Sequence, residues 1–309
     1  MPSSAKLVLD LLAQSPVAFI AAASAVGLVV GSFLNVVVYR LPIMLERQWQ
    51  AQCTPPPQPT AAAPAAAAAP QPPFNLVVPR SCCPACRAPI SAIHNIPLLS
   101  YLALRGRCAG CQAKISLRYP AVELLSALST AVVAWRFGFG WPAGCAIVVG
   151  WFLIALTFID LDHQLLPDAL TLPLLWLGLI ASLAGWNSSA HALPSDPASA
   201  IGGAAIGYLS LWAVFHLFRL LTGKEGMGYG DFKLLAALGA WLGWQMLLPI
   251  VLLSAVVGAI LGATLIVLRR QQRGNPIPFG PFLAAAGWVA MLWGPQMVGR
   301  YLGLFAPHG

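Results

Sequence analysis

Long apolar runs dominate this chain, and short polar stretches separate them. A helix needs about 20 predominantly apolar residues to cross the hydrocarbon core of a bilayer. Eight runs reach or approach that length, at residues 17–39, 120–135, 141–158, 169–186, 200–221, 232–244, 247–267 and 281–302. The second and the sixth are the short ones. The pattern predicts an all-α polytopic membrane protein with about eight transmembrane helices embedded in a lipid bilayer.

The composition agrees with a membrane protein. Hydrophobic residues make up 59% of the chain and charged residues only 8%, whereas a soluble domain carries about 25% charged residues. The formal net charge of +8 does not indicate a nucleic-acid partner, because such binding needs basic clusters with aromatic residues on an aqueous face. Here the basic residues stand mostly at the ends of apolar runs. We therefore expect no nucleic-acid binding.

The basic residues also predict the orientation of the helices. If the loop after the first run is cytoplasmic, all but three of the 17 Lys and Arg residues lie on that side; the exceptions are Lys6, Arg136 and Arg300. Cytoplasmic loops carry the excess of Lys and Arg in membrane proteins, so both termini are expected on the outer side. The first run is too long for the apolar core of a signal peptide and lacks a basic segment before it, so it is expected to stay as a span.

Three parts are predicted along the chain. Residues 1–42 form the first span, residues 43–119 a cytoplasmic loop, and residues 120–309 the remaining membrane domain. Within the loop, residues 54–73 consist mainly of Pro and Ala, a composition typical of an extended spacer without a packed core. The tetracysteine region at residues 81–119 follows it. No internal repeat is evident.

Four of the seven cysteines form two CxxC pairs, Cys83 with Cys86 and Cys108 with Cys111. Two such turns place four thiolates around one Zn²⁺ in tetrahedral geometry. A site closed by four sulfurs has no open coordination position, so this zinc is expected to be structural. Disulfides are disfavoured because the cytoplasm keeps thiols reduced. Redox-active thiols and thiols without a ligand remain alternatives.

Acidic residues inside or beside membrane spans are costly and usually functional. Asp160 ends the apolar run WFLIALTFID, and Asp231 opens a later run on the same side. Two carboxylates that share a proton allow one to activate water while the other protonates the carbonyl or the leaving amine. Asp231 also suits a helix N-cap, but Gly228 and Gly230 before it favour a close approach of the backbone by another group.

The other acidic residues near the spans have structural interpretations. Asp168 follows Leu-Pro and precedes an apolar run, so it is predicted to be the N-cap of the next helix. Asp162 and the adjacent histidine are predicted to be solvated loop residues. Glu123 is predicted to pair with an arginine, and Glu225 with the lysine before it.

At this point several blocks of the sequence resemble the type IV prepilin peptidase family, the GxGD-type membrane aspartyl proteases. The blocks follow one another in the order and at the spacing of that family. They are GSFLNVVVYRLP (31–42), CPAC (83–86), NIPLLSYLALRGRCAGC (95–111), RYPAVE (118–123), FIDLDHQLLPD (158–168), GMGYGD (226–231) and PIPFGPFLAAAG (276–287). The Pro/Ala tract departs from the family pattern, but it lies between the blocks.

The resemblance implies a function. Asp160 and Asp231 would be the catalytic pair that cleaves the leader of type IV prepilins and pseudopilins after a glycine. It further implies methylation of the new N-terminal residue with S-adenosylmethionine as donor. No Gly-rich fingerprint of a dinucleotide-binding fold appears, so only the region around Gly106 and the cysteines is nominated for methyl transfer. The expected location is the bacterial inner membrane, with periplasmic termini and with the cysteines and both aspartates on the cytoplasmic side.

Two other classes of function fit part of the pattern. A polytopic transporter also keeps acidic residues near Gly-rich breaks in its spans, and a non-catalytic membrane assembly factor would also use a zinc scaffold. Against a transporter, Asp160 and Asp231 lie at the inner boundary rather than mid-membrane, and the two halves of the chain show no symmetry. Shortening of a prepilin by the purified protein would distinguish the peptidase from both.

Overall fold

The computed structural model describes residues 4–53, 73–83, 85–91, 96–184, 193, 195–224, 226–268 and 278–305. The predicted Pro/Ala spacer lies outside these residues except for Pro73. Glu225 and the first two residues of the PIPFGPFLAAAG block also lie outside them.

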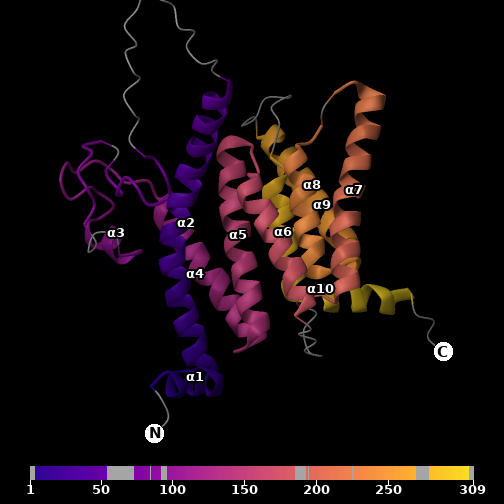
Figure 1. The fold of residues 1–309 in the computed structure, drawn as a ribbon, viewed down its shortest axis with the longest axis horizontal. Coiled ribbons are helices and arrows are strands. Elements are labelled where there is room, and N and C mark those ends of the chain that lie inside the picture. Colours follow the sequence, from indigo (N-terminus) through magenta and orange to yellow (C-terminus); the bar gives the residue numbers. More distant parts are fainter. Residues whose placement is uncertain are drawn as a thin grey trace, which may run out of the picture. The chain divides into compact units, whose positions relative to one another are not determined.

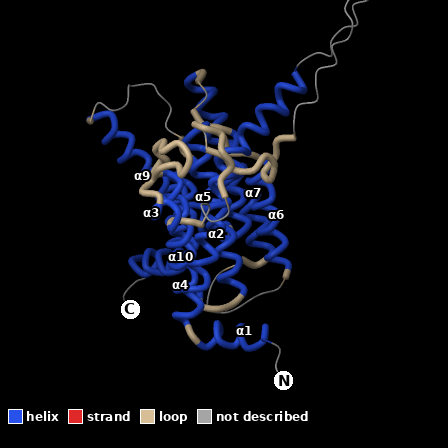
Figure 2. Tube along the Cα trace, turned by 90° about the vertical axis from the view of Figure 1, so that its left-hand side faces the viewer, coloured by secondary structure: helices blue, strands red, loops and turns tan. Residues whose placement is uncertain are grey.

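Helices make up most of the described part of the chain (Figures 1 and 2). They are α1 (Ser4–Gln14), α2 (Pro16–Cys53), α3 (Leu99–Ala103), α4 (Arg118–Phe137), α5 (Trp141–His163), α6 (Asp168–Leu183), α7 (Pro197–Thr222), α8 (Tyr229–Leu242), the short 3-10 helix η2 (Trp244–Met246), α9 (Leu247–Val267) and α10 (Gly280–Phe305). Extended pairing among the described residues is limited to two isolated bridges, Cys82 with Pro89 and Arg107 with Lys114. The prediction of an all-α fold is confirmed.

Each of the eight predicted spans coincides with a helix, α2 or one of α4 to α10. Four helical segments of the described chain are both long and apolar enough to cross a membrane: Pro16–Cys53, Trp141–His163, Pro197–Thr222 and Trp244–Leu265. Asp168–Leu183 is apolar but shorter. The membrane character is therefore supported, while the number of eight spans stays a prediction.

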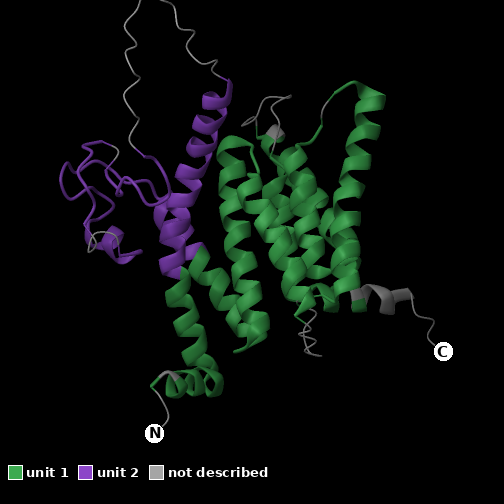
Figure 3. Cartoon of the chain, in the orientation of Figure 1, with its two compact units in different colours: residues 1–27, 126–309 green, residues 28–125 purple. Residues whose placement is uncertain are grey.

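The chain divides into two compact units (Figure 3). The first, called here the membrane unit, contains residues 1–27 and 126–309, and the second, the cysteine unit, contains residues 28–125. The boundaries fall inside α2 and α4, so each of these helices contributes residues to both units. The three-part division by sequence stays a prediction.

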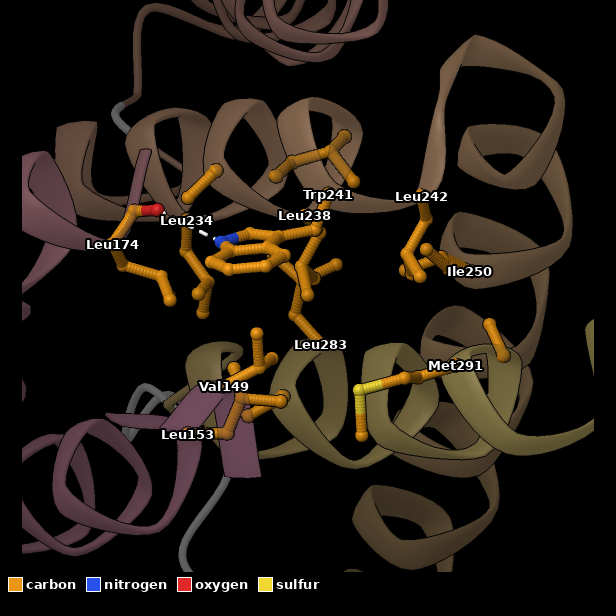
Figure 4. Close-up of a cluster of buried hydrophobic side chains, with 14 of the residues drawn as sticks. Val149, Leu153, Leu174, Leu234, Leu238, Trp241, Leu242, Ile250, Leu283 and Met291 are labelled. Carbon is orange, nitrogen blue, oxygen red and sulfur yellow. Dashed lines mark hydrogen bonds between the residues drawn. The ribbon is translucent and has the colours of Figure 1, made fainter. Parts of the chain in front are cut away.

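Helix α8 forms the centre of the membrane unit. It packs against α6, α7 and α10, and all of its residues from Asp231 to Leu242 except Lys233 are buried. Figure 4 shows the Trp241 indole among buried side chains, where its N–H donates to the Leu174 carbonyl at 2.8 Å. This burial explains how a helix of 14 residues belongs to a membrane unit, because neighbouring helices rather than lipid surround it.

Small residues bring α7 and α8 together. A Cβ added at Gly203 would collide with the backbone of Gly239, and one added at Gly207 would lie 2.8 Å from the Leu235 carbonyl oxygen. The hydrophobic effect does not drive helices together in a bilayer, because lipid tails are as apolar as the side chains. Helix association there relies on such close van der Waals packing. The contact fixes the helix whose first turn carries Asp231.

Candidate active site and metal centre

Asp160 lies in the last turn of α5 and is 5% exposed. Its backbone carbonyl accepts a hydrogen bond from the Gln164 amide at 2.9 Å. Gln164 has φ +51°, and this left-handed residue ends the helix. The prediction that Asp160 marks the end of this helical span agrees with the structure to within one turn.

Asp231 lies in the first turn of α8 and is 6% exposed. Gly228 occupies the N-cap position with an extended backbone, so Asp231 is not itself the N-cap. Its Oδ1 atom is buried and has no hydrogen-bond partner among the described residues. Buried polar atoms are nearly always hydrogen-bonded, and an exception needs an explanation such as a catalytic role or a bound water.

The structure brings these two residues together although 70 positions separate them in the sequence. Their carboxylates lie close enough for the charge of Asp160 to act on Asp231. The Asp160 carboxylate also accepts a hydrogen bond from the backbone amide of Gly280, the first residue of α10. Two carboxylates in a buried site are one arrangement that supports general acid–base hydrolysis.

The other acidic residues have structural contacts or exposed positions. Pro167 is the N-cap of α6, so the prediction that Asp168 caps this helix is wrong. Asp168 is the first helical residue, and its Oδ1 pairs with Lys233 Nζ at 2.6 Å. Glu123 accepts a hydrogen bond from the Leu98 amide at 2.9 Å, a partner that the sequence did not suggest. Asp162 is exposed but belongs to α5 rather than to a loop.

The two glycines before Asp231 differ in their surroundings. A Cβ added at Gly230 would lie 2.6 Å from Leu166 Cβ, so packing within this chain already requires glycine there. A Cβ added at Gly228 would make only ordinary contacts, the nearest at 3.7 Å from Asp231 Oδ2. Gly228 is therefore the one with room for a substrate backbone.

The four predicted cysteine ligands converge in the cysteine unit. All four sulfur atoms lie within 4.8 Å of one another. The Cys83 and Cys111 sulfurs are 3.8 Å apart, and those of Cys86 and Cys108 are 4.0 Å apart. Tetrahedral Zn–S bonds of about 2.3 Å place sulfurs roughly 3.8 Å from one another. The cluster therefore fits one metal ion.

The two CxxC turns share the same backbone geometry. The Arg87 amide bonds the Cys83 carbonyl at 2.9 Å, and the Gln112 amide bonds the Cys108 carbonyl at 3.0 Å. Arg87 and Gln112 have φ of +57° and +59°, so each turn closes through a left-handed residue after its second cysteine. This repetition presents two pairs of sulfurs to a common centre.

Backbone amides favour the ionised, thiolate form of Cys83. The amides of Cys86 and Ala85 lower the pKa of the Cys83 thiol to about 6. At Cys111 the Ala113 amide lowers the pKa, but neighbouring sulfurs and burial outweigh it and raise the value to about 11. Four thiolates at this spacing repel one another, and a divalent cation at their centre would remove that repulsion.

Gly106 lines a cavity of about 420 Å³ in the cysteine unit. The cavity wall also contains Tyr101, Arg105, Arg107 and Lys114. Gly106 has φ +69°, and a Cβ there would lie 2.7 Å from the Tyr101 hydroxyl. The three basic side chains around this cavity can bind a carboxylate or phosphate group, and the Tyr101 ring can stack on a flat ring.

Comparison with known proteins covers both units of the chain. The family model of the bacterial peptidase A24 N-terminal domain matches residues 25–137, and that of the type IV leader peptidase family matches residues 147–263. The chain belongs to the type IV leader peptidase family. The four cysteines lie in the residues that match the N-terminal domain model, and Asp160 and Asp231 lie in those that match the type IV leader peptidase model.

Relatives in the type IV leader peptidase family resemble the chain over nearly its whole length. The prepilin leader peptidase/N-methyltransferase of Stutzerimonas stutzeri is 54% identical over 297 residues, covering 95% of this chain and 97% of the relative. Its counterpart in Pseudomonas aeruginosa is 54% identical over 294 residues, with the same coverage. That of Xanthomonas campestris is 48% identical over 281 residues, covering 91% and 93%. No solved structure matches the chain.

Proposed function

We propose that this chain is a membrane aspartic endopeptidase and N-methyltransferase. It removes the leader of type IV prepilins and pseudopilins after a glycine, and then methylates the new N-terminal residue with S-adenosylmethionine as donor. The observation that carries the peptidase proposal is the convergence of Asp160 and Asp231 in a buried site of a type IV leader peptidase family member. The names of the relatives support both activities.

The two aspartates divide the chemistry of peptide hydrolysis. One ionised carboxylate accepts a proton from water as the water oxygen attacks the scissile carbonyl carbon. The other, protonated carboxyl donates its proton to the carbonyl oxygen. As the tetrahedral intermediate collapses and the C–N bond breaks, the carboxyl that took the proton from water donates it to the leaving amine nitrogen. The other carboxylate takes back a proton from a hydroxyl of the intermediate, which becomes the new carboxyl group. Water is consumed, and the pair returns to its starting state with one shared proton.

The proposed location is the bacterial inner membrane, with both termini periplasmic. The distribution of Lys and Arg supports this orientation. Asp160 stands at the C-terminal end of α5 and Asp231 at the N-terminal end of α8. If the topology is as proposed, both lie at the cytoplasmic face. A prepilin with a basic leader followed by an apolar helix would present its cleavage site at that face.

We assign one structural Zn²⁺ to Cys83, Cys86, Cys108 and Cys111. The mutual sulfur distances support this assignment. Four sulfur ligands leave no open position for water or substrate, so the metal would stabilise the cysteine unit and take no part in peptide hydrolysis.

We place the methyl-donor site in the cavity beside Gly106. S-adenosylmethionine carries a carboxylate and an adenine ring, and the basic side chains and Tyr101 of the cavity match these two features. The left-handed backbone at Gly106 disfavours any other residue at this position. This cavity is separate in sequence from both aspartates, so methyl transfer and cleavage would be separable by mutation.

Arg105→Ala and Lys114→Ala are expected to lower methyl transfer and to spare leader cleavage. Losing a hydrogen bond to a charged group costs about 1.5–3 kcal/mol, which corresponds to roughly 10- to 100-fold in methylation rate at limiting donor. The measurement is the mass of the processed pilin with and without its methyl group. Arg80→Ala, a basic residue outside the cavity wall, serves as the charge-matched control. Equal methylation in all three variants would exclude this cavity.

The test of the proposed function uses the purified chain in detergent with a type IV prepilin as substrate. Mass spectrometry is expected to detect loss of the leader after a glycine, and one added methyl group only when S-adenosylmethionine is present. A transporter or a non-catalytic assembly factor would leave the prepilin intact. An unshortened prepilin after incubation with folded, membrane-inserted protein would overturn the proposal.

A further inference from the structure

We propose that the first residue of α10 is part of the peptidase site: Gly280 positions the Asp160 carboxylate, and Leu166 sets its spacing from Asp231. This inference rests on the proposed peptidase function. It assigns positioning roles to two residues that are not themselves proton donors or acceptors in the reaction.

Gly280 contacts Asp160 through its backbone. Its amide donates a hydrogen bond to the Asp160 carboxylate. A Cβ added at Gly280 would lie 2.5 Å from Asp160 Oδ2 and 3.1 Å from Asp160 Cγ. Contacts under 3.0 Å are essentially never made by a Cβ atom, so any side chain here would displace the carboxylate. Glycine at this position is what allows the amide to reach it.

The start of α10 is fixed by its own hydrogen bonds. The Phe282 and Leu283 amides both bond the Phe279 carbonyl at 3.1 Å. Leu283 is fully buried, and α10 packs against α5, α8 and α9. The Gly280 amide is therefore held by a packed helix, and it fixes the orientation of the Asp160 side chain.

Leu166 contacts both the start of α10 at Gly280 and the residue before Asp231, Gly230. It follows α5 in the chain and is 7% exposed. Its Cδ1 lies 3.2 Å from the Cβ position of Gly280 and 3.3 Å from that of Gly230, the residue before Asp231. One buried leucine is thus enclosed by the glycine that holds Asp160 and the glycine that precedes Asp231.

This packing gives the dyad a defined geometry. Proton sharing between two carboxylates and one water depends on distances, and a misplacement of about 1 Å can cost roughly 10²-fold in rate. Protein interiors transmit such displacements because they are close-packed. A change at Gly280 or Leu166 should therefore act on the chemical step and leave substrate binding unchanged.

Gly280→Ala tests the inference, with Gly299→Ala as its matched control. Gly299 lies on the same helix, and no atom stands within 4 Å of its Cβ position. We expect Gly280→Ala to lower the kcat of leader cleavage by roughly 10²-fold with KM, melting temperature and methylation of a previously cleaved pilin unchanged. Gly299→Ala should match the wild type in all four measurements.

A second pair of variants covers the case in which Gly280→Ala does not fold. Leu166→Ala is expected to lower kcat with KM unchanged, because the spacing between the carboxylates relaxes. Leu174→Ala removes another buried leucine, which packs near Trp241 instead, and should lower the melting temperature with kcat retained.

The outcomes separate this inference from the proposed function. If the wild type does not cleave prepilin, the proposed function fails. If the wild type cleaves and Gly280→Ala cleaves equally fast, the positioning role is wrong. A variant that loses methylation and thermal stability together with cleavage would also overturn it, because that pattern marks a general structural defect. Equal kcat values in Leu166→Ala and Leu174→Ala would overturn the role of Leu166 in setting the spacing of the two carboxylates.

Discussion

Asp160→Asn and Asp231→Asn are each expected to reduce leader cleavage by about 10²–10⁴-fold, the usual contribution of a positioned acid or base. Asparagine preserves the size of the side chain, but it can neither accept the proton of water nor supply one to the scissile carbonyl. The measurement is the initial rate of prepilin shortening at equal amounts of membrane-inserted protein. Both variants are expected to insert into the membrane as the wild type does.

Asp162→Asn and Asp168→Asn are the matched controls for the dyad variants. Asp162 is exposed, and Asp168 forms an ion pair with Lys233 in which the Asp168 side chain is 56% exposed and the Lys233 side chain 28%. Such a pair contributes at most about 1 kcal/mol, so both controls should retain most of the cleavage rate. Rapid cleavage by either dyad variant would contradict the assignment of Asp160 and Asp231.

Removal of the metal, or a Cys→Ser change at any of the four ligands, is expected to unfold the region around the cysteines. Structural zinc sites contribute about 10–16 kcal/mol of apparent binding free energy, which becomes folding free energy. The two CxxC turns are short loops, so little else in the region replaces that energy. Elemental analysis should find one zinc per chain, and limited proteolysis within residues 81–119 should accelerate after chelation.

Cys82→Ser provides the control for the metal site. Cys82 is exposed and adjoins the first ligand, but it lies outside the cluster. Its variant should keep the zinc and the resistance to proteolysis. Protein prepared without chelators that contains no zinc would contradict the assignment. Cleavage activity that follows zinc content while the fold stays intact would instead indicate a catalytic metal.

The positions of the helices follow closely from the apolar runs. The run at residues 232–244 predicts α8 although it is short for a span. Hydropathy alone does not tell a helix that faces lipid from one that other helices enclose, and the burial of α8 depends on Gly203 and Gly207 of a separate helix. That is why the helices are predictable while the number that crosses the membrane is not.

The candidate site residues also divide into those that the sequence predicts and those that only the folded structure reveals. Asp160 and Asp231 can be predicted as candidate site residues because a carboxylate at the edge of an apolar run is costly without a function. The roles proposed for Gly280 and Leu166 cannot be predicted in this way, because they depend on contacts between segments far apart in the sequence. The position of Asp168 between Leu-Pro and an apolar run predicts a cap, but Pro167, with an extended backbone, occupies the N-cap position of α6 and Asp168 is the first helical residue. Its carboxylate is then available to Lys233.

The most direct measurement of the central claim, that Asp160 and Asp231 act as one pair, compares kcat/KM for leader cleavage among four proteins. These are the wild type, each single Asp→Asn variant and the double variant, all with one prepilin. When two residues serve the same step as a unit, removing the second costs little beyond removing the first. We predict that the double variant cleaves about as fast as the slower single variant. A single variant near the wild-type rate, or a double variant whose loss is the product of the two single losses, would contradict the pair.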